Sequence, residues 1–473
     1  MPQRRYPVVD SLKRYVRKGL IPFHTPGHLQ GKAAPPVLSH WWGRSVFEAD
    51  LTEVPGLDDL SAPVGAIRRA QEQTAAMAGA GETFFLVNGS TAGVQAMFLA
   101  ATRPGDAVIL PRAVHRSVIS SLVLSGAQPE FIPGWSPDGL TIPLPPRESD
   151  YREALERHPR VRALFTVYPD YYGVAADLKA LSGLARACEL PLLVDAAHGV
   201  LFGRHPGMPP GAMACGADAA VESVHKRAGA LTQAAWLHVQ GDRLERSRIR
   251  DSLRILTTTS PSYLLLASLD GARRQLEVSG FSICERQIEL AEHARRALSR
   301  LPGVGVLRGL PEGYMIDPTR LVVSFKEARV SGLTAAKQMR RCGVVVEMAD
   351  FTGVVLLFSP AHRMRDLKVL LRAVETALKG PKTRMTVPFP QAPPLRINPR
   401  EAWLAPAKQV ALESAVGLVS AETAAPAPPG IPVLVPGEEV TPEAVAYLKS
   451  LRDAGVAVHG TADRRLETLR VVR

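Results

Sequence analysis

The chain has few of the features that mark secreted, membrane-spanning or metal-scaffolded proteins. Only four of its 473 residues are cysteines, and they stand far apart without a paired spacing (Cys188, Cys215, Cys284 and Cys342). This pattern excludes a disulfide framework and a common zinc motif, and we expect buried thiols in a reducing compartment. No apolar run reaches the roughly 18 residues of a membrane span, so no membrane partner is expected. Because the first six residues lack an apolar signal core, we expect a cytoplasmic protein.

Acidic residues are outnumbered by basic ones. The 57 Lys and Arg residues against 45 Asp and Glu give a formal net charge of +12 at pH 7. An excess of this sign is found in many nucleic-acid-binding proteins. Here the basic residues are spread along the whole chain, and no nucleic-acid motif accompanies them. We therefore interpret the charge as an Arg-rich surface and expect no nucleic-acid partner.

What the first half of the chain does have is a regular alternation of apolar runs and helical segments. The clearest runs lie at residues 83–87, 107–110, 162–167, 192–194 and 219–221. Near-continuous apolar runs separated by helices predict an α/β domain whose parallel sheet is covered on both faces. Ligands of such sheets bind at the carboxyl ends of the strands. Polar motifs follow these runs directly, so we expect a ligand site at that edge.

Two of these motifs follow neighbouring runs: Asp195-Ala196-Ala197-His198-Gly199 and Ser223-Val224-His225-Lys226. A lone lysine after a strand is usually a solvated loop residue, but the pair of motifs indicates more. A pyridoxal-phosphate site needs an amine for a Schiff base, a carboxylate that keeps the pyridine nitrogen protonated, and hydroxyls and amides for the phosphate. Lys226, Asp195 and Ser223 with His225 are residues of these types, so we predict pyridoxal 5'-phosphate as the cofactor.

A third motif, Asn88-Gly89-Ser90-Thr91-Ala92-Gly93, joins a predicted strand to a predicted helix. Free backbone amides and the helix dipole make such a junction an anion site, although Asn-Gly-Ser also forms ordinary turns. Since a phosphate is already expected, we interpret this motif as its cradle.

The chain divides into four predicted parts without internal repeats. Residues 1–60 form an arm rich in Pro, Gly and His, whose spacings match no common zinc pattern, so no metal is expected. Residues 61–262 form the cofactor-binding large domain. Residues 263–380 form a small α+β domain, with a long helix over 263–301, strands near 320–325, 344–348 and 354–358, and helices over 331–341 and 364–378. Residues 381–473 form a linker and a C-terminal domain.

Taken together, the motifs resemble the Orn/Lys/Arg decarboxylase family of bacterial fold-type I pyridoxal-phosphate enzymes over almost the whole chain. The resemblance implies a transferase-like large domain with a mainly parallel seven-stranded sheet, a small α+β domain and a small C-terminal decarboxylase-type domain. The motifs that carry it are His24–His28, Thr52–Leu60, Asn88–Thr91, His115–Val118, Asp195–Gly199, Ser223–Lys226 and Pro428–Glu438.

The resemblance also implies a role for each matching residue. Lys226 would carry the cofactor and Asp195 would pair with the pyridinium nitrogen. Ala197 would pack on one ring face, and His115 would stack on the other. His198 would lie beside the ring, and a proton would be returned to the substrate carbon by Lys226 or a nearby histidine. The residues implied to hold the phosphate are Ser90, Thr91, Ser223 and His225. The plainer alternatives are that His115 is a surface residue at a helix start and His198 a turn residue bonded to backbone.

Four positions depart from the family's usual residues. Leu29 replaces a common Lys, Ser61 a common His, Asp170 the Thr of a Pro-Thr-Tyr turn, and Ala196 the Glu of an Asp-Glu-Ala-His turn. None of them removes the predicted lysine or aspartate, so they bear on the substrate and on the efficiency of decarboxylation.

The implied reaction is α-decarboxylation of arginine, lysine or ornithine to the corresponding polyamine-type amine and carbon dioxide. A cationic substrate needs an acidic partner, and Glu347, Asp350 and Asp170 are the predicted ones, unless they are solvated loop carboxylates. The alternatives are an aminotransferase or lyase of the same fold, and a decayed non-catalytic homologue. Because the arm has too few apolar residues for a core, we expect it to cover a second copy's site in a homodimer or larger homo-oligomer.

Overall fold

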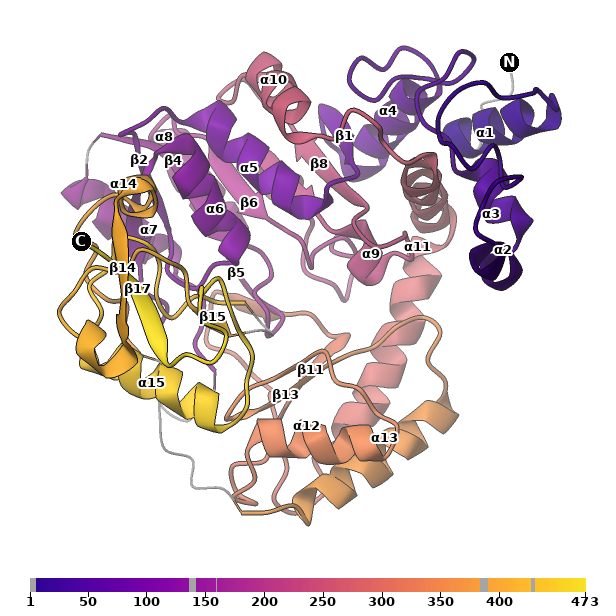
Figure 1. The fold of residues 1–473 in the computed structure, drawn as a ribbon. Coiled ribbons are helices and arrows are strands. Elements are labelled where there is room, and N and C mark those ends of the chain that lie inside the picture. Colours follow the sequence, from indigo (N-terminus) through magenta and orange to yellow (C-terminus); the bar gives the residue numbers. More distant parts are fainter. Residues whose placement is uncertain (1–5, 136–141, 159, 383–389, 427–429) are drawn as a thin grey trace. The chain divides into compact units, whose positions relative to one another are not determined.

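The structure is a computed structural model, and it describes residues 6–135, 142–158, 160–382, 390–426 and 430–473 (Figure 1). The chain forms two compact units, each assembled from separate stretches of sequence. The first unit comprises Met1–Ala101, Pro191–His205 and Pro210–Ser282. The second comprises Thr102–Leu190, Pro206–Pro209 and Ile283–Arg473. The positions of the three boundaries between the four predicted parts stay predictions.

Seven strands form one sheet in the order β1-β8-β7-β6-β4-β2-β3. Parallel pairing joins β2 to β3, β2 to β4 and β6 to β7, whereas β8 runs antiparallel to both β1 and β7. The predicted fold-type I sheet, mainly parallel and seven-stranded, is therefore confirmed. Its strands are β1 (Glu82–Leu86), β2 (Ala107–Pro111), β3 (Gln128–Ile132), β4 (Val161–Val167), β6 (Leu192–Asp195), β7 (Ala219–Glu222) and β8 (Ala235–Val239).

Helices of the first unit begin and end where its sequence allows. Helix α4 ends at Gly79, which has the left-handed φ of 68° that glycine tolerates best. Helix α5 packs very closely on the sheet at Gly93, where a Cβ atom would lie 2.6 Å from Val221 Cγ2 and 2.8 Å from Leu86 Cδ1. The helices of this unit are α1 (Pro7–Arg17), α2 (Pro36–Trp42), α3 (Arg44–Ala49), α4 (Ala66–Ala78), α5 (Gly89–Ala101), α9 (Val224–Arg227) and α10 (Arg246–Leu256), and α11 (Tyr263–Leu298) continues into the second unit.

The arm contains more helix than its proline content suggests. Pro7 and Pro36 stand at the starts of α1 and α2, where the missing N–H has no helical partner to lose. The Asp270 side chain in α11 accepts hydrogen bonds from the first turn of α1, from Val8 N at 2.9 Å and Val9 N at 3.3 Å. One buried carboxylate thus fixes the beginning of the arm to the long helix.

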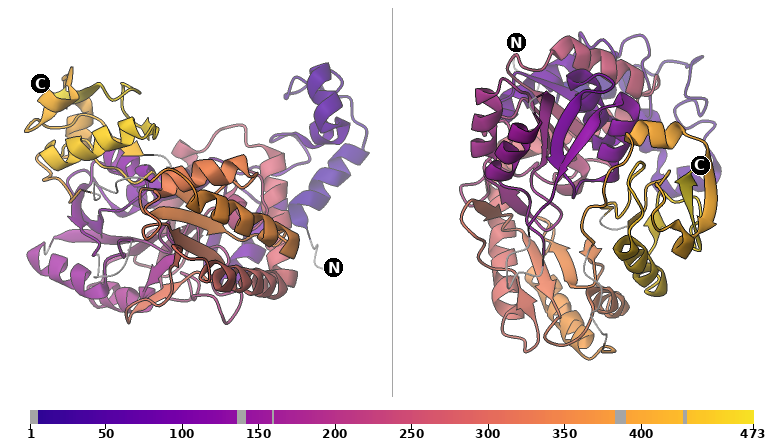
Figure 2. Two further views of the ribbon diagram at one scale, coloured as in Figure 1. Left: turned by 90° about the horizontal axis from the view of Figure 1, so that it is seen from below. Right: turned by 90° about the vertical axis from the view of Figure 1, so that its left-hand side faces the viewer.

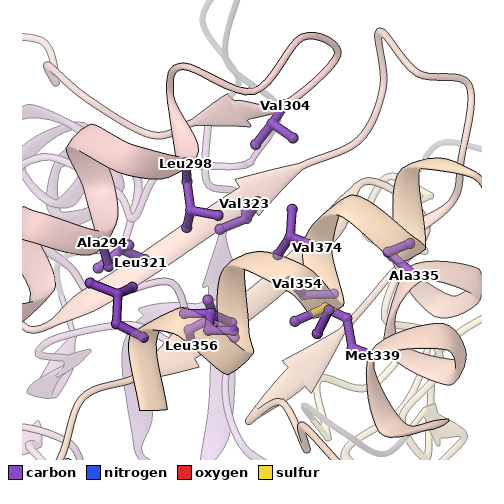
Figure 3. Packing of buried hydrophobic residues seen from close by; sticks show 14 of the residues in the cluster. Ala294, Leu298, Val304, Leu321, Val323, Ala335, Met339, Val354, Leu356 and Val374 are labelled. Atoms are coloured by element: carbon purple, nitrogen blue, oxygen red, sulfur yellow. The ribbon is translucent and has the colours of Figure 1, made fainter. Parts of the chain in front are cut away.

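The small domain has a core of its own between a four-stranded sheet and three helices (Figure 3). Helices α12 and α13 lie side by side along this sheet (Figure 2). The predicted strand over 344–348 is wrong in extent, because only Met348 and Ala349 pair with β13. The elements are β9 (Gly305–Val306), β11 (Arg320–Ser324), α12 (Gly332–Arg341), β12 (Met348–Ala349), β13 (Gly353–Leu357) and α13 (Met364–Leu378).

The C-terminal part of the second unit has a separate core built around α15. Strands β14 and β17 pair antiparallel, from Ala407 with Val472 to Ala411 with Thr468. Its elements are α14 (Pro399–Leu404), β14 (Ala407–Ala411), the 3-10 turn Leu412–Ala415, β15 (Ala425–Pro426), α15 (Pro442–Asp453), β16 (Val458–His459) and β17 (Thr468–Val472). The remaining elements of the second unit are α6 (Arg116–Ser125), α7 (Glu148–Arg157), β5 (Val174–Ala176), α8 (Leu178–Ala187) and β10 (Tyr314–Ile316).

No helix within the described ranges is both long and apolar enough to cross a membrane. Over the same residues, no group of three or more His, Cys, Asp or Glu side chains is placed to hold a metal ion. In the described part of the chain, none of the four cysteines takes part in a disulfide.

Candidate cofactor site

Two predicted motifs come together at the carboxyl ends of β6 and β7. The strands are parallel with Asp195 opposite Val221, so the residues that follow them are neighbours. Beyond the strand ends, Ser223 N donates a hydrogen bond to Ala197 O at 3.3 Å. Residues 224–227 then form the single helical turn α9, where the sequence predicted a turn.

Asp195 is buried and lightly bonded. Its side chain is 6% exposed, and Oδ1 accepts a hydrogen bond from Ala197 N at 3.0 Å. Burial raises the pKa of Asp195, and the charge of Lys226 opposes this increase. Within the described part of the chain, Oδ2 has no hydrogen-bond donor, so this oxygen remains available to a cationic N–H group of a ligand.

Lys226 presents an exposed amine beside a buried histidine. Its Nζ lies 3.0 Å from Nε2 of His198, whose side chain is buried. At this distance the two nitrogens can form a hydrogen bond with one proton between them. If His198 Nε2 carries that proton, it donates to a neutral Lys226 amine; if Nε2 is unprotonated, it accepts a proton from Lys226. His198 therefore contacts the predicted lysine, which a turn histidine bonded only to backbone would not do.

The predicted phosphate residues lie on two elements that meet. Ser223 Oγ donates to Ser90 Oγ at 2.8 Å, which brings together hydroxyls more than 130 positions apart in the sequence. Ser90 and Thr91 lie in the first turn of α5, after Gly89 with its φ of 77°. The close approach at Gly93 allows this turn to reach the strand end.

His225 is held by its backbone neighbour. Its Nδ1 lies 3.0 Å from Ala234 O, so this nitrogen carries a proton that it donates to the carbonyl. Burial lowers the pKa of His225, which keeps the ring neutral and its Nε2 an acceptor. Donation to a phosphate by Nε2 would require a second proton on the ring.

His115 lies in the second unit, at the start of α6. It is half-buried, and its Nδ1 accepts a hydrogen bond from Ser117 N at 3.2 Å and lies 2.9 Å from Ser117 Oγ. The ring is thus oriented by its own helix. Its predicted stacking on the cofactor ring stays a prediction.

The three predicted substrate carboxylates differ sharply. Glu347 is exposed. Asp350 accepts hydrogen bonds from the Tyr172 hydroxyl at 2.8 Å, from both Thr352 N and Oγ1 at 2.6 Å, and from Gly353 N at 2.8 Å.

Asp170 lies in the turn after β4 and is half-buried. Burial raises its pKa to about 7, although the bond from Val174 N at 2.8 Å and the nearby Arg320 oppose this.

The positions that depart from the family pattern are ordinary in three cases. Ala196 is buried beside Asp195, Ser61 N donates to Asp59 Oδ1, and Asp170 closes its turn. Leu29 is different, because its φ of 50° lies in the left-handed region that bulky residues seldom adopt.

Two further features were missed by the sequence analysis. Asp58 accepts bonds from Gly65 N and Ile67 N at the start of α4, and Tyr263 Oη donates to its carbonyl at 2.6 Å. Arg112 forms a buried ion pair with Glu438, more than 320 positions away. Asp58 could have been singled out, because it lies in the motif Thr52–Leu60. The ion pair could not, because the sequence around neither residue indicates a distant partner.

The residues of the first unit fit pyridoxal phosphate. The available oxygen of the buried Asp195 suits a protonated ring nitrogen, the Lys226 amine is exposed to an aldehyde, and the Ser90 and Ser223 hydroxyls suit a phosphate. The aspartate, lysine and hydroxyls predicted in this unit are thus brought to one edge of its strands.

Comparisons with known proteins agree with this chemistry. Residues 6–310 match the family model described as Orn/Lys/Arg decarboxylase, major domain, and residues 382–462 match the C-terminal domain of the same family. The motif Pro428–Glu438 lies within this second match, but its first two residues, Pro428 and Pro429, are outside the described residues. The chain is 36% identical to an arginine decarboxylase of Bacillus subtilis over 100% of this chain and 99% of that relative. It is 35% identical to one of Halalkalibacterium halodurans over 100% and 98%.

Solved structures show the same fold. The constitutive lysine decarboxylase of Escherichia coli superposes with a TM-score of 0.83 at 21% identity, covering 99% of this chain and 82% of that one. An alanine–glyoxylate aminotransferase from Nostoc reaches 0.52 at 20% identity over 66% of this chain and 86% of that one. The aminotransferase likeness extends over only part of the chain, whereas the decarboxylase likeness covers nearly all of it.

Proposed function

This chain belongs to the Orn/Lys/Arg decarboxylase family, and we propose that it decarboxylates a basic amino acid, arginine first, with pyridoxal phosphate as its cofactor. The observation that carries the proposal is the buried Asp195 carboxylate on the strand next to the Lys226–His198 pair. Arginine is preferred because the relatives at 34–36% identity over the whole chain are named arginine decarboxylases.

When bound, the cofactor supplies an electron sink for the pair of electrons left behind by the departing carboxylate. The role of Asp195 is to hold a proton on the ring nitrogen. A carboxylate that is desolvated and lacks other strong partners stabilises an adjacent cation more than a solvated one does, because the local dielectric is low. Ser90, Thr91 and Ser223 would hold the phosphate end through their hydroxyls.

Lys226 and His198 handle the protons. Lys226 must be neutral to attach the cofactor, and His198 at 3.0 Å can take up or return the proton that this requires. After carbon dioxide has left, the same pair is proposed to return a proton to the substrate carbon. His115 is proposed to cover the second ring face and exclude water from it.

For the cationic end of the substrate we favour Asp170 among the three predicted carboxylates. It follows a strand of the large sheet, and its raised pKa of about 7 marks a carboxylate whose ionised form lacks sufficient stabilisation. A guanidinium would provide that stabilisation. Asp170 also accepts a hydrogen bond in its own turn, from Val174 N, but Asp350 already accepts four, and Glu347 is exposed to water.

We further propose a cytoplasmic homodimer as the smallest active form. The arm exposes large apolar side chains: Ile21 is 77% exposed, Phe23 98% and Trp41 76%. Apolar surface concentrated in one short segment is typical of a protein–protein contact, and a second copy of this chain is the occupant we propose. Sedimentation at assay concentration tests this, since a fully active monomer would refute it.

The reaction is tested by carbon dioxide release from the purified, cofactor-loaded protein. Arginine, lysine and ornithine are compared with leucine and norleucine, which have no cationic side chain. We expect release from a basic amino acid and negligible release from the neutral pair. If a keto acid instead takes up the amino group, the protein is an aminotransferase. If neither reaction occurs while Lys226 carries the cofactor, it is a decayed homologue.

A further inference from the structure

Arg112 ties the loop before α6 to a distant segment of the second unit. Its Nε donates to Glu438 Oε1 and its Nη2 to Glu438 Oε2, both at 2.9 Å. Nη1 donates to Pro432 O at 2.9 Å and Nη2 to Val433 O at 3.3 Å. The guanidinium also lies over the Phe131 ring, 5.4 Å from its centre. We call residues Gly430–Glu438 the supporting segment.

This ion pair is shielded from water at both ends. Arg112 is 6% exposed and Glu438 is fully buried. Glu438 Oε2 also accepts a bond from Val435 N at 2.9 Å, so the carboxylate is held from three directions. A buried, bidentate pair of this kind fixes geometry strongly, because any displacement leaves a charge without its partner.

The same segment reaches the ring of His115, three residues after Arg112. A Cβ atom on Gly430 would lie 3.5 Å from Cδ2 and 3.8 Å from Nε2 of that imidazole. Gly430 has a φ of 89°, and its N donates to Pro426 O at 2.7 Å. The opposite edge of the ring is held at Nδ1 by Ser117. The imidazole is therefore bonded to its own helix at one edge, and the supporting segment passes next to its other edge.

We propose that the supporting segment positions His115 for the cofactor, with Arg112 and Glu438 as the positioning pair. The inference rests on the proposed function, in which His115 covers one face of the cofactor ring. It assigns the C-terminal domain a part in cofactor binding: this domain sets the orientation of a histidine at the start of α6, in the connection that follows β2.

The first test needs no cofactor. In the full-length, cofactor-free protein, the rate of His115 modification by diethyl pyrocarbonate is followed by peptide mass spectrometry. Glu438→Gln keeps the size of the side chain but removes the charge that holds Arg112. We expect His115 to react about tenfold faster, the factor expected when a hydrogen bond to a charged group is lost. The exposed His293 serves as the internal reference.

The matched control is the neighbouring residue. Glu439→Gln breaks the ion pair between Glu439 Oε2 and Arg396 Nη2, which are 2.7 Å apart. This pair is not shielded from water, since the Arg396 side chain is 57% exposed. The substitution should leave the His115 rate at the wild-type value. Equal rates in Glu438→Gln and wild type, or the same increase in Glu439→Gln, would overturn the proposal.

The second test links the pair to the cofactor. We expect Glu438→Gln to weaken pyridoxal-phosphate binding and to change the visible circular dichroism of the bound cofactor in the same sense as His115→Ala. In the His115→Ala background, Glu438→Gln should add nothing further, because its effect passes through the ring. Full additivity of the two losses would show that the segment does not act through His115.

Arg112→Lys covers the case in which Glu438→Gln fails to fold. It keeps the buried charge but loses the two-pronged geometry, so the same changes should follow at smaller size. A protein that binds the cofactor but decarboxylates no basic amino acid would refute the proposed function alone. An unchanged His115 rate in an active enzyme would refute the positioning role alone.

Discussion

Two aspartates, Asp195 and Asp350, both stand at the ends of strands, and both were predicted to bind a cation. Asp195 accepts one hydrogen bond from its own chain. Asp350 accepts four, three of them from its own hairpin and the fourth from Tyr172. Sequence patterns see two strand-end carboxylates, whereas the hydrogen bonds separate a carboxylate that can serve a ligand from one that serves the fold.

The difference also appears in the cost of burial. Asp195 is desolvated with few compensating donors, so the folded chain without a ligand carries an unfavourable charge at this position. The turn around Asp350 offsets that cost internally. A buried carboxylate that binds a ligand is thus recognised by its small number of hydrogen-bond donors within the chain.

The largest effect should come from Lys226, which completes the site around Asp195. Lys226→Arg keeps a cation near His198 but removes the amine that attaches the cofactor. We expect no borohydride-stable cofactor label and no turnover, measured by peptide mapping and carbon dioxide release. A label found on another lysine would mean that this other lysine, and not Lys226, attaches the cofactor next to Asp195.

Asp195→Asn should separate catalysis from stability. Turnover should fall by about 10²–10³ with the cofactor still bound, as for loss of one good electrostatic stabiliser. Near-normal turnover would show that the Asp195 carboxylate does not stabilise the cofactor, and the contrast drawn with Asp350 would then fail.

In the cofactor-free protein, the same substitution, Asp195→Asn, should increase stability although it lowers turnover in the loaded enzyme. Because the folded-state pKa of Asp195 is raised above its unfolded value, the stability it contributes is present in acid and lost as pH rises through the folded-state pKa. Asp195→Asn should therefore unfold at a higher temperature than wild type at neutral pH, and the gap should close in acid. Calorimetry across pH checks this.

Asp170 offers an intermediate case. With its pKa at about 7, kcat/KM for arginine should rise as pH increases through that value, because the carboxylate must ionise to bind the guanidinium. Asp170→Asn should flatten this part of the profile and raise KM roughly tenfold with less effect on kcat. An unchanged KM would return the substrate role to Asp350 or Glu347.

Asp350→Ala should destabilise the hairpin and leave substrate binding intact. Losing the acceptor of four hydrogen bonds should lower the free energy of unfolding by about 1–3 kcal/mol. Denaturant unfolding and the KM for arginine are measured together. A raised KM with unchanged stability would reverse the comparison and make Asp350 a ligand-binding carboxylate.

Glu347→Ala is the matched truncation at the other end of β12, and it should have the smallest effect. The side chain is exposed, so stability should change by less than about 0.5 kcal/mol and KM should stay at the wild-type value. Any selective loss of arginine over norleucine discrimination would show that this carboxylate faces the substrate.

The sequence was sufficient wherever structure is encoded locally. Helix α13 has both its predicted ends, Met364 and Leu378, and the large sheet follows from its apolar runs. The Asp195 and Lys226 motifs were recognisable because both end neighbouring strands, and parallel strands bring their ends together.

Features that depend on distant partners were not predictable in this way. The pairing of β14 with β17 and the ion pair between Arg112 and Glu438 leave no periodic trace in either segment. The β-branched residues Val344 to Val346 predicted a longer strand, but a strand also requires a partner ladder, and only Met348 and Ala349 pair with β13.

The contact at Gly93 has a consequence for mutational tolerance. Every single-nucleotide missense change of a glycine codon introduces a residue with a Cβ, and here that atom would fall 2.6 Å from Val221 Cγ2 on a rigid strand. Such a change pushes α5 outward and carries the hydroxyls of its first turn with it. In a saturation library selected for activity, position 93 should therefore be as depleted as a ligand-binding residue, although it is a residue with no side chain to offer a ligand.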